Sequence, residues 1–168
     1  MRGMARWEDV ERAEPDFAGR VRRLLDAHKH KTMATLRRDG SPRISGTEST
    51  FSGGDLWIGS MPGALKARDL QRDPRVALHS GSVDPDESDP GSWPGDAKLA
   101  GRAVEITEPA ERAAFWRDYP EPQPAGVDES HLFRIEPTEV VLTRVEPAEG
   151  LVIESWHEGR GYRRRSRA

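Results

Sequence analysis

The sequence contains no cysteine, and this absence excludes several kinds of site at once. A chain without thiols has no disulfide scaffold, no thiolate metal site, no iron–sulfur cluster and no cysteine nucleophile. No segment approaches the ~18 consecutive apolar residues that a membrane-spanning helix needs. Residues 1–14 are charged and lack the apolar core of a secretory signal peptide. We therefore expect a cytoplasmic protein that does not enter the membrane.

Net charge is also small. The 168 residues carry a formal charge of -3, which gives no reason to expect a nucleic-acid partner. Hydrophobic residues make up 35% and charged residues 33%, which indicates a modest core inside a well-hydrated surface. The length suits one domain, with no repeat and no second domain, so we treat residues 1–168 as a single unit.

Helical periodicity is clearest near the N-terminus. After a tail over residues 1–14, apolar residues at helical spacing predict an amphipathic helix over residues 15–30. Its expected inner face consists of Phe17, Val21, Leu24, Leu25 and His28. Shorter helices are predicted over residues 64–71 and 107–118, the second with Ala110, Ala113, Ala114 and Trp116 available for packing.

Most of the remaining chain has the pattern of strands. The turn signals Asp39-Gly40 and Gly53-Gly54 predict two hairpins in succession. The expected strands are 31–37, 42–51, 56–58, 75–80, 97–107, 131–135, 139–145 and 151–156. The connections are a long exposed loop over residues 81–96, a proline-rich loop over 120–127, and a basic segment over 157–168. Seven or eight mostly antiparallel strands favour closure into a barrel, because closure removes exposed edges.

Three short blocks, in this order, resemble the pyridoxamine 5'-phosphate oxidase-like family of flavin-binding split barrels over about residues 20–165. The first block is Met33-Ala34-Thr35-Leu36 with Asp39-Gly40-Ser41-Pro42-Arg43-Ile44-Ser45. The second is Leu56-Trp57-Ile58-Gly59-Ser60, Lys66-Ala67-Arg68-Asp69-Leu70 and Asp73-Pro74-Arg75-Val76-Ala77-Leu78. The third is Trp156-His157-Glu158-Gly159 with the arginines that follow. The resemblance implies a mainly β split barrel of six to eight antiparallel strands with peripheral helices, working as a homodimer with the cofactor between two barrels.

For flavin mononucleotide (FMN), the resemblance implies a phosphate site at Ser60 and Lys66, joined by Arg68. A strand end followed by a helix N-terminus can point a hydroxyl, backbone N–H groups and an ammonium at one anion. Many relatives carry another basic residue beside this lysine, where here Ala64 and Leu65 stand. Arg43 is a candidate replacement. The alternative is that Lys66 and Arg68 form a solvated helix face.

The resemblance also implies residues around the flavin ring. Ser45, Gly46 and Thr47 would line it, with Thr35 on the neighbouring strand, because short residues allow close backbone approach. The alternative is an ordinary strand with a glycine bulge. Trp156 would edge the ring from the partner subunit, or would be an ordinary core or interface tryptophan.

The basic segment offers substrate contacts. Arg163 and Arg165, with Arg167, are candidates to bind anions of the substrate or cofactor, unless the segment is a disordered tail. In the vitamin-oxidising relatives a histidine lies between two arginines. Here Arg165 takes its place, which puts pyridoxamine phosphate in doubt as the substrate. None of the five histidines has metal-ligand spacing, so no metal site is expected, and His79 is a candidate proton donor near the ring.

These residues favour an oxidoreductase that moves a hydride between a flavin-type cofactor and a small organic substrate. No strong acid or base is needed, since the chemistry takes place on the cofactor. Two cofactors fit, FMN and the deazaflavin coenzyme F420, with FMN favoured by the broader family. The alternatives are a non-catalytic flavin or haem carrier and a structural dimer with an empty groove. Four tryptophans are large apolar residues that could support the dimer interface: Trp57, Trp93, Trp116 and Trp156.

Overall fold

The structure of this chain is a computed structural model that describes residues 4–119 and 126–167. Its described residues form one nine-stranded sheet, in which every pair of neighbouring strands is antiparallel. The strands are β1 (Lys31–Leu36), β2 (Pro42–Thr47), β3 (Ser49–Ser52), β4 (Asp55–Ser60), β5 (Arg75–His79), β6 (Asp96–Glu105), β7 (His131–Glu146), β8 (Gly150–His157) and β9 (Gly161–Arg167).

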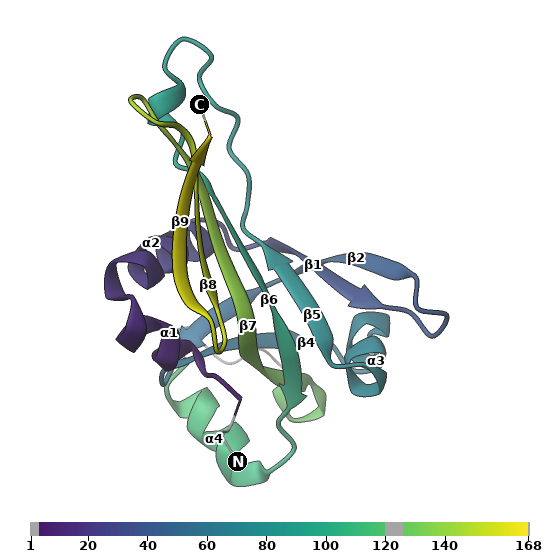
Figure 1. Cartoon of the computed structure of the whole chain (residues 1–168). Coiled ribbons are helices and arrows are strands. Elements are labelled where there is room, and N and C mark those ends of the chain that lie inside the picture. The colour runs from purple at the N-terminus through teal and green to yellow at the C-terminus, as the bar shows by residue number, and fades with distance from the viewer. Residues whose placement is uncertain (1–3, 120–125, 168) are drawn as a thin grey trace.

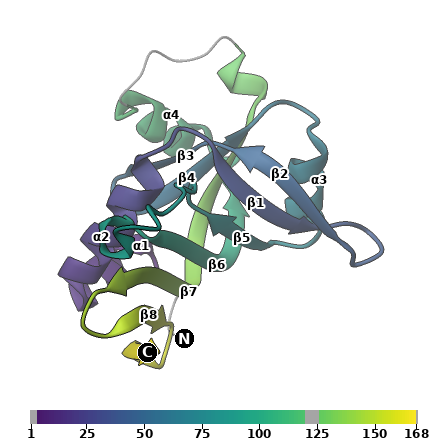
Figure 2. The ribbon, with the colours of Figure 1, turned by 90° about the horizontal axis from the view of Figure 1, so that it is seen from above.

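Helices lie around this sheet. They are α1 (Trp7–Ala13), α2 (Pro15–Asp26), α3 (Leu65–Arg72) and α4 (Pro109–Arg117), with the short 3₁₀ turns η1 (Pro90–Ser92) and η2 (Val127–Glu129). None of the helices in the described ranges is long and apolar enough to cross a membrane. Viewed from above, α1 and α2 cover one side of the sheet and α4 lies at another (Figure 2).

The strand order is β2-β1-β5-β6-β7-β4-β3, and β7 also pairs with β8, which pairs with β9. The two ends of this path, β2 and β3, are not paired with each other, so the barrel is split rather than closed. The far half of β7 continues with β8 and β9 into a ribbon that projects from the barrel (Figure 1). The sequence expectation of a mainly β split barrel with peripheral helices is confirmed, with nine strands instead of seven or eight.

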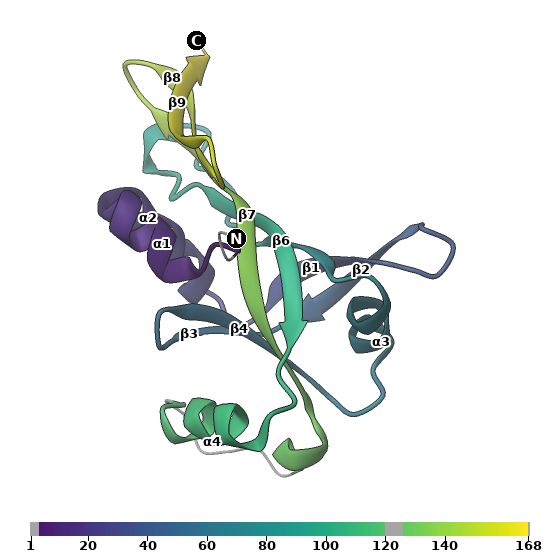
Figure 3. The same ribbon diagram turned by 60° about the horizontal axis from the view of Figure 1, so that its bottom comes forward.

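Two apolar clusters hold the fold together. The larger one joins α1 and α2 to the sheet and includes Trp7, Val21, Leu56 and Ile135. The smaller one lies on the other face of β4, where Trp57 packs on Phe115 of α4. Figure 3 shows β3 and β4 lying between these two helical layers. Alternate residues of β4 therefore point into different clusters, as the pleat of a strand requires.

Strand β7 differs from expectation, because it runs without a break through Glu136 and Pro137. The register with β6 shifts between Ala100 and Gly101, so Pro137 lies opposite Gly101 at a β-bulge. A Cβ on Gly101 would lie 2.2 Å from the Glu136 carbonyl oxygen. The bulge thus accommodates a proline that would otherwise interrupt the ladder, and only a glycine fits opposite it.

Other boundaries also moved. The predicted strand 42–51 is two strands with Glu48 between them. The helix predicted over 15–30 ends at Asp26, and His28 is exposed rather than on its inner face. The loop between β5 and β6 is exposed as expected, with η1 inside it. Within the predicted proline-rich loop, residues 120–125 lie outside the described ranges.

Both ends of the chain are more ordered than the sequence indicated. The expected N-terminal tail contains α1, whose Trp7 and Val10 are buried in the larger cluster. The expected basic tail contains β9, paired along its length with β8. Tyr162 of β9 donates a hydrogen bond to the buried carboxylate of Glu154 in β8, which also accepts from Arg20 and Arg144.

Candidate functional site

A cavity of ≈ 460 Å³ lies where β2, β4, the start of α3 and α4 meet. This volume falls within the range of small-molecule and cofactor pockets. The cavity has two chemically different walls. One is polar or open and includes Gly46, Thr47, Ser60 and Lys66, and the other is aromatic and includes Trp57, Phe115, Trp116 and Tyr119.

The polar wall combines the end of one strand with the start of one helix. Ser60 is the last residue of β4, and its hydroxyl oxygen is buried with no hydrogen-bond partner. Lys66 is in the first turn of α3, and its ammonium donates to the Gly46 carbonyl over 2.7 Å. Burial lowers the pKa of Lys66 below its ordinary 10.5, and Glu48 partly counters this. An unpaired hydroxyl beside a lysine held by a single carbonyl can accommodate an anion.

Two glycines keep the same wall open. A Cβ placed on Gly46 or on Gly59 would meet no atom within 4 Å, other than those of its chain neighbours. Gly59 lies on the face of β4 that also carries Trp57, since residues two apart in a strand share a face. A flat ring can therefore approach the backbone closely here.

The aromatic wall comes mainly from α4. The ring centroids of Trp57 and Phe115 are 4.9 Å apart, and those of Trp116 and Tyr119 are 5.1 Å apart. The Trp57 indole donates to the Ser52 carbonyl, whereas the Trp116 indole nitrogen is buried without a partner. The sequence indicated Trp116 only as a packing or interface residue. The closeness of Phe115, Trp116 and Tyr119 in the sequence, at the end of α4 and just after it, was the available signal.

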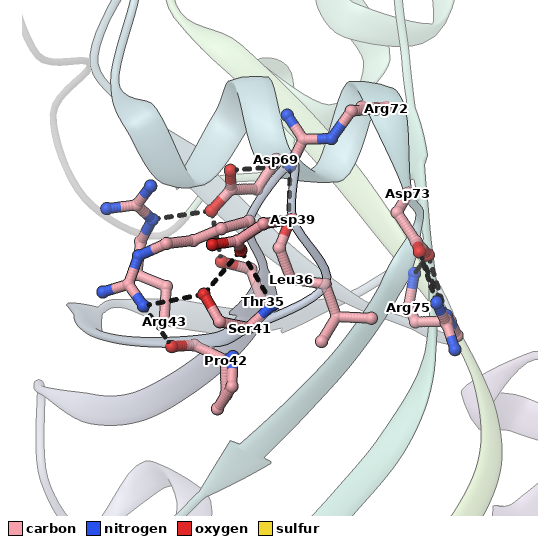
Figure 4. Close-up of polar contacts among 11 residues, drawn as sticks. Thr35, Leu36, Asp39, Ser41, Pro42, Arg43, Asp69, Arg72, Asp73 and Arg75 are labelled. Atoms are coloured by element: carbon pink, nitrogen blue, oxygen red, sulfur yellow. Dashed lines mark hydrogen bonds and ion pairs between the residues drawn. The ribbon is translucent and has the colours of Figure 1, made fainter.

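Arg43 and Thr35 meet at a different place, the carboxylate of Asp69 in α3 (Figure 4). Asp69 accepts from the Thr35 hydroxyl over 2.9 Å, from Arg43 Nε over 2.6 Å and from Arg72 over 3.0 Å. Burial opposes ionisation, but the three donors outweigh it and the pKa of Asp69 lies below its ordinary 3.8. This network fixes α3 to β1 and β2, and neither Arg43 nor Thr35 lines the cavity.

Two further predicted residues lie near the cavity without lining it. Ser45 is half-buried on the same face of β2 as Arg43 and Thr47. Arg68 is exposed in α3, with a guanidinium nitrogen 3.5 Å from the place of a Gly63 Cβ.

The remaining predicted residues lie elsewhere in the chain. His79 pairs across the sheet with the exposed Thr32, on the face opposite Met33, and its Nδ1 lies 2.7 Å from the Ser80 carbonyl oxygen. Trp156 is 6% exposed and belongs to the larger apolar cluster. Arg163 and Arg165 are exposed on β9 in the projecting ribbon. Within a single chain, the structure does not bring these four residues to the cavity.

In the described part of the chain, no group of three or more histidine, aspartate or glutamate residues is arranged to hold a metal ion. The site is therefore characterised by one partly buried cation, an orphan hydroxyl, open glycines and aromatic rings in tilted and edge-to-face contact. This donor set suits an organic molecule that carries an anionic group and a planar ring.

The comparisons with known proteins agree with the fold. The sequence profile of the pyridoxamine 5'-phosphate oxidase family matches residues 17–144. No curated protein matches the sequence. PhzG from Burkholderia lata, in complex with tetrahydrophenazine-1-carboxylic acid, superposes with a TM-score of 0.65 at 14% identity, covering 95% of each chain.

Two other solved structures show the same fold. A putative pyridoxamine 5'-phosphate oxidase from Listeria innocua has a TM-score of 0.55 at 16% identity, covering 74% of this chain and 95% of its own. An F420 reductase has a TM-score of 0.50 at 21% identity, covering 70% of this chain and 92% of its own. At these identities the structural likeness supports the fold, and the family assignment comes from the profile.

Proposed function

The chain belongs to the pyridoxamine 5'-phosphate oxidase family, and we propose that it is an oxidoreductase that transfers a hydride between bound FMN and a small organic substrate. The observation that carries this proposal is the cavity beside β4, with Lys66 and the orphan hydroxyl of Ser60 on one wall and aromatic rings on the other.

The residues present fit a phosphate-bearing cofactor. Lys66 and Ser60 would hold the phosphate, because a charge-assisted hydrogen bond and an unused hydroxyl satisfy an anion that has left water. Gly46 and Thr47 would lie against the ring, since the open space at Gly46 allows close approach. Arg43 is ion-paired with Asp69 and does not line the cavity, so we assign it no direct contact with the phosphate.

When bound, FMN supplies the chemistry of accepting and returning a hydride. The chain's own residues would bind and orient the cofactor and the substrate, and would exclude water from them. The rings of Trp57, Phe115 and Trp116, in tilted and edge-to-face contact, present an apolar surface to a planar substrate. The unpaired Trp116 indole offers a hydrogen-bond donor to a carbonyl on that substrate.

The deazaflavin coenzyme F420 is the alternative cofactor. The likeness to an F420 reductase supports keeping it as a candidate, and the same cation and hydroxyl serve either molecule. FMN is preferred because the matching family profile is that of pyridoxamine 5'-phosphate oxidase.

A homodimer completes this proposal. Trp57 and Trp156 are buried within their own chain, so they contribute no exposed surface to an interface. Exposed apolar side chains around β2 and α3 are the better candidates, namely Ile44, Met61 and Leu65. Arg163, Arg165 and His79 could reach a cofactor only from a second copy, whose presence light scattering at micromolar concentration would test.

The redox proposal is tested on the loaded protein. Purified apo-protein is titrated with FMN and, in parallel, with F420, and binding is followed by fluorescence. The complex that forms is reduced without oxygen and mixed with menadione as a planar acceptor. We expect reoxidation at least ten times faster than that of the free cofactor. A bound cofactor that reoxidises no faster would favour a non-catalytic carrier, and a failure to bind either cofactor would reject the proposal.

A further inference from the structure

A chain of hydrogen bonds outside the cavity holds the segment that carries Lys66. The Gly63 amide donates to His131 Nε2 over 3.2 Å, and His131 Nδ1 lies 2.7 Å from a carboxylate oxygen of Glu105. The other oxygen of Glu105 accepts from the Gln71 amide over 2.9 Å. Gly63 precedes α3 and Gln71 lies in its last turn, so one carboxylate is connected to both ends of the helix.

The chemistry of this chain fixes the state of the histidine. A backbone N–H can only donate, so Nε2 of His131 is the acceptor in its bond with Gly63. Its proton must then be on Nδ1, where Glu105 accepts it. Glu105 thereby selects the one neutral form of the ring that can hold the Gly63 amide.

The positions of these residues relate them to the cavity. His131 lies directly opposite Ser60 in the pairing of β4 with β7. The turn that follows Ser60 contains Met61 and Gly63, and Gly63 has a φ of 70°, which favours glycine. The same turn leads into Lys66, so the histidine holds the connection between the two residues of the polar wall.

We propose that His131 and Glu105 are positioning residues, which set the separation of Ser60 and Lys66 and so the affinity for the cofactor phosphate. This inference rests on the proposed function, because it assigns the polar wall to a phosphate. Neither His131 nor Glu105 lines the ≈ 460 Å³ cavity. Both act through the Gly63 turn.

Their environment separates this role from general support of the fold. The side chains of His131 and Glu105 are 18% and 24% exposed, and the His131 ring lies nearly parallel to that of Phe133 with the ring centroids 6.2 Å apart. The Met61 side chain is 78% exposed, so few packing contacts hold the turn apart from this chain of hydrogen bonds. Loss of the chain should therefore loosen the turn without unfolding the barrel.

The test uses His131→Leu, which removes the acceptor, and His131→Gln, whose amide can accept from Gly63 and donate to Glu105. His28→Leu is the control, at an exposed histidine that does not line the cavity. Dissociation constants are measured for FMN and for riboflavin, its analogue without phosphate. We expect His131→Leu to weaken FMN binding by roughly 3- to 10-fold, the worth of one hydrogen bond. Riboflavin binding should change less than twofold, and His131→Gln should restore FMN binding.

A second readout needs no cofactor. Amide hydrogen exchange at Gly63 in the unloaded protein should be faster in His131→Leu than in wild type, and normal in His131→Gln. Unchanged exchange in His131→Leu would overturn the positioning role whatever the cofactor does. Faster exchange in His131→Leu, together with no preference of wild type for FMN over riboflavin, would support the role of His131 in holding the Gly63 turn. It would reject the proposed phosphate site, and with it the effect on cofactor affinity. Equal weakening of both ligands would also overturn the inference, since it would indicate general loosening.

Discussion

The carboxylate of Glu154 is the most deeply buried charge in the projecting ribbon, and replacing it by glutamine should loosen β9. The side chain is 2% exposed and accepts hydrogen bonds from Arg20 of α2, Arg144 of β7 and Tyr162 of β9. Burial raises the pKa of Glu154, but these donors outweigh it and the net shift is downward. Burial and the bond to Glu154 raise the pKa of Tyr162 to about 12.

The size of the effect follows from the partners that are left behind. Breaking a buried ion pair from one side costs about 3–5 kcal/mol, because the other charge stays buried. Here Arg20 and Arg144 are 33% and 22% exposed, so water reaches them and reduces the cost. We expect Glu154→Gln to lower the free energy of unfolding by about 2–4 kcal/mol, or Tm by roughly 5–15 °C. Tyr162→Phe should cost about 1.5 kcal/mol, since one donor to a charged acceptor is lost.

Thermal and urea unfolding of both single variants and of the double variant measure these losses. If the three donors act through one carboxylate, the double variant should lose about 1 kcal/mol less than the sum of the two single losses. Glu149→Gln is the matched control, because its partner Arg164 forms an exposed pair on the same ribbon. A Tm for Glu154→Gln no lower than that for Glu149→Gln would refute the reasoning.

Two further predictions concern backbone fit and acid stability. Gly101→Ala should lose about 1–3 kcal/mol in urea unfolding, because its Cβ meets a carbonyl oxygen at 2.2 Å. Gly59→Ala should stay within about 0.5 kcal/mol of wild type, since its Cβ enters open space, but it should weaken cofactor binding. Equal losses of stability in Gly101→Ala and Gly59→Ala would contradict the close backbone contact at the bulge. The pKa of Asp69 is lowered when folded, so its contribution to stability is present above its ordinary pKa of 3.8 and is lost as pH falls further. Urea unfolding from pH 6 to pH 3 should therefore show a steeper fall in the free energy of unfolding for wild type than for Asp69→Asn. Parallel plots of this free energy against pH would contradict the stabilising role of the Asp69 carboxylate.

Local signals in the sequence were sufficient for most of the barrel. The turn at Asp39-Gly40, the periodicity of α2 and the helix at α3 each depend on residues close in sequence, and each appears within a few residues of its predicted bounds. The family resemblance also placed Gly46, Thr47, Ser60 and Lys66 together, and the structure brings these four to one cavity. Their contact with a cofactor stays a prediction.

What could not be predicted depends on partners distant in sequence. The basic run in β9 has the pattern of a solvated tail, whereas in the fold it pairs with β8 and its Tyr162 donates to the buried Glu154. Pro137 looks like the end of a strand until Gly101 is placed opposite it. In the sequence, Asp69 is an ordinary charged residue of a polar helix. Only the fold brings the donors Thr35 and Arg43 to its carboxylate. The aromatic wall likewise exists only once α4 folds over Trp57.

The most direct test of the account compares FMN with riboflavin on wild type, Lys66→Ala and Lys98→Ala. Lys66 lines the cavity and donates to the Gly46 carbonyl. Lys98 is an exposed lysine of β6 and serves as the control. The account predicts that wild type binds FMN more tightly than riboflavin. Lys66→Ala should weaken FMN binding roughly 10- to 150-fold, the worth of one charge-assisted hydrogen bond, and leave riboflavin binding unchanged. Equal binding of the two ligands, or an equal effect of Lys66→Ala and Lys98→Ala, would contradict it.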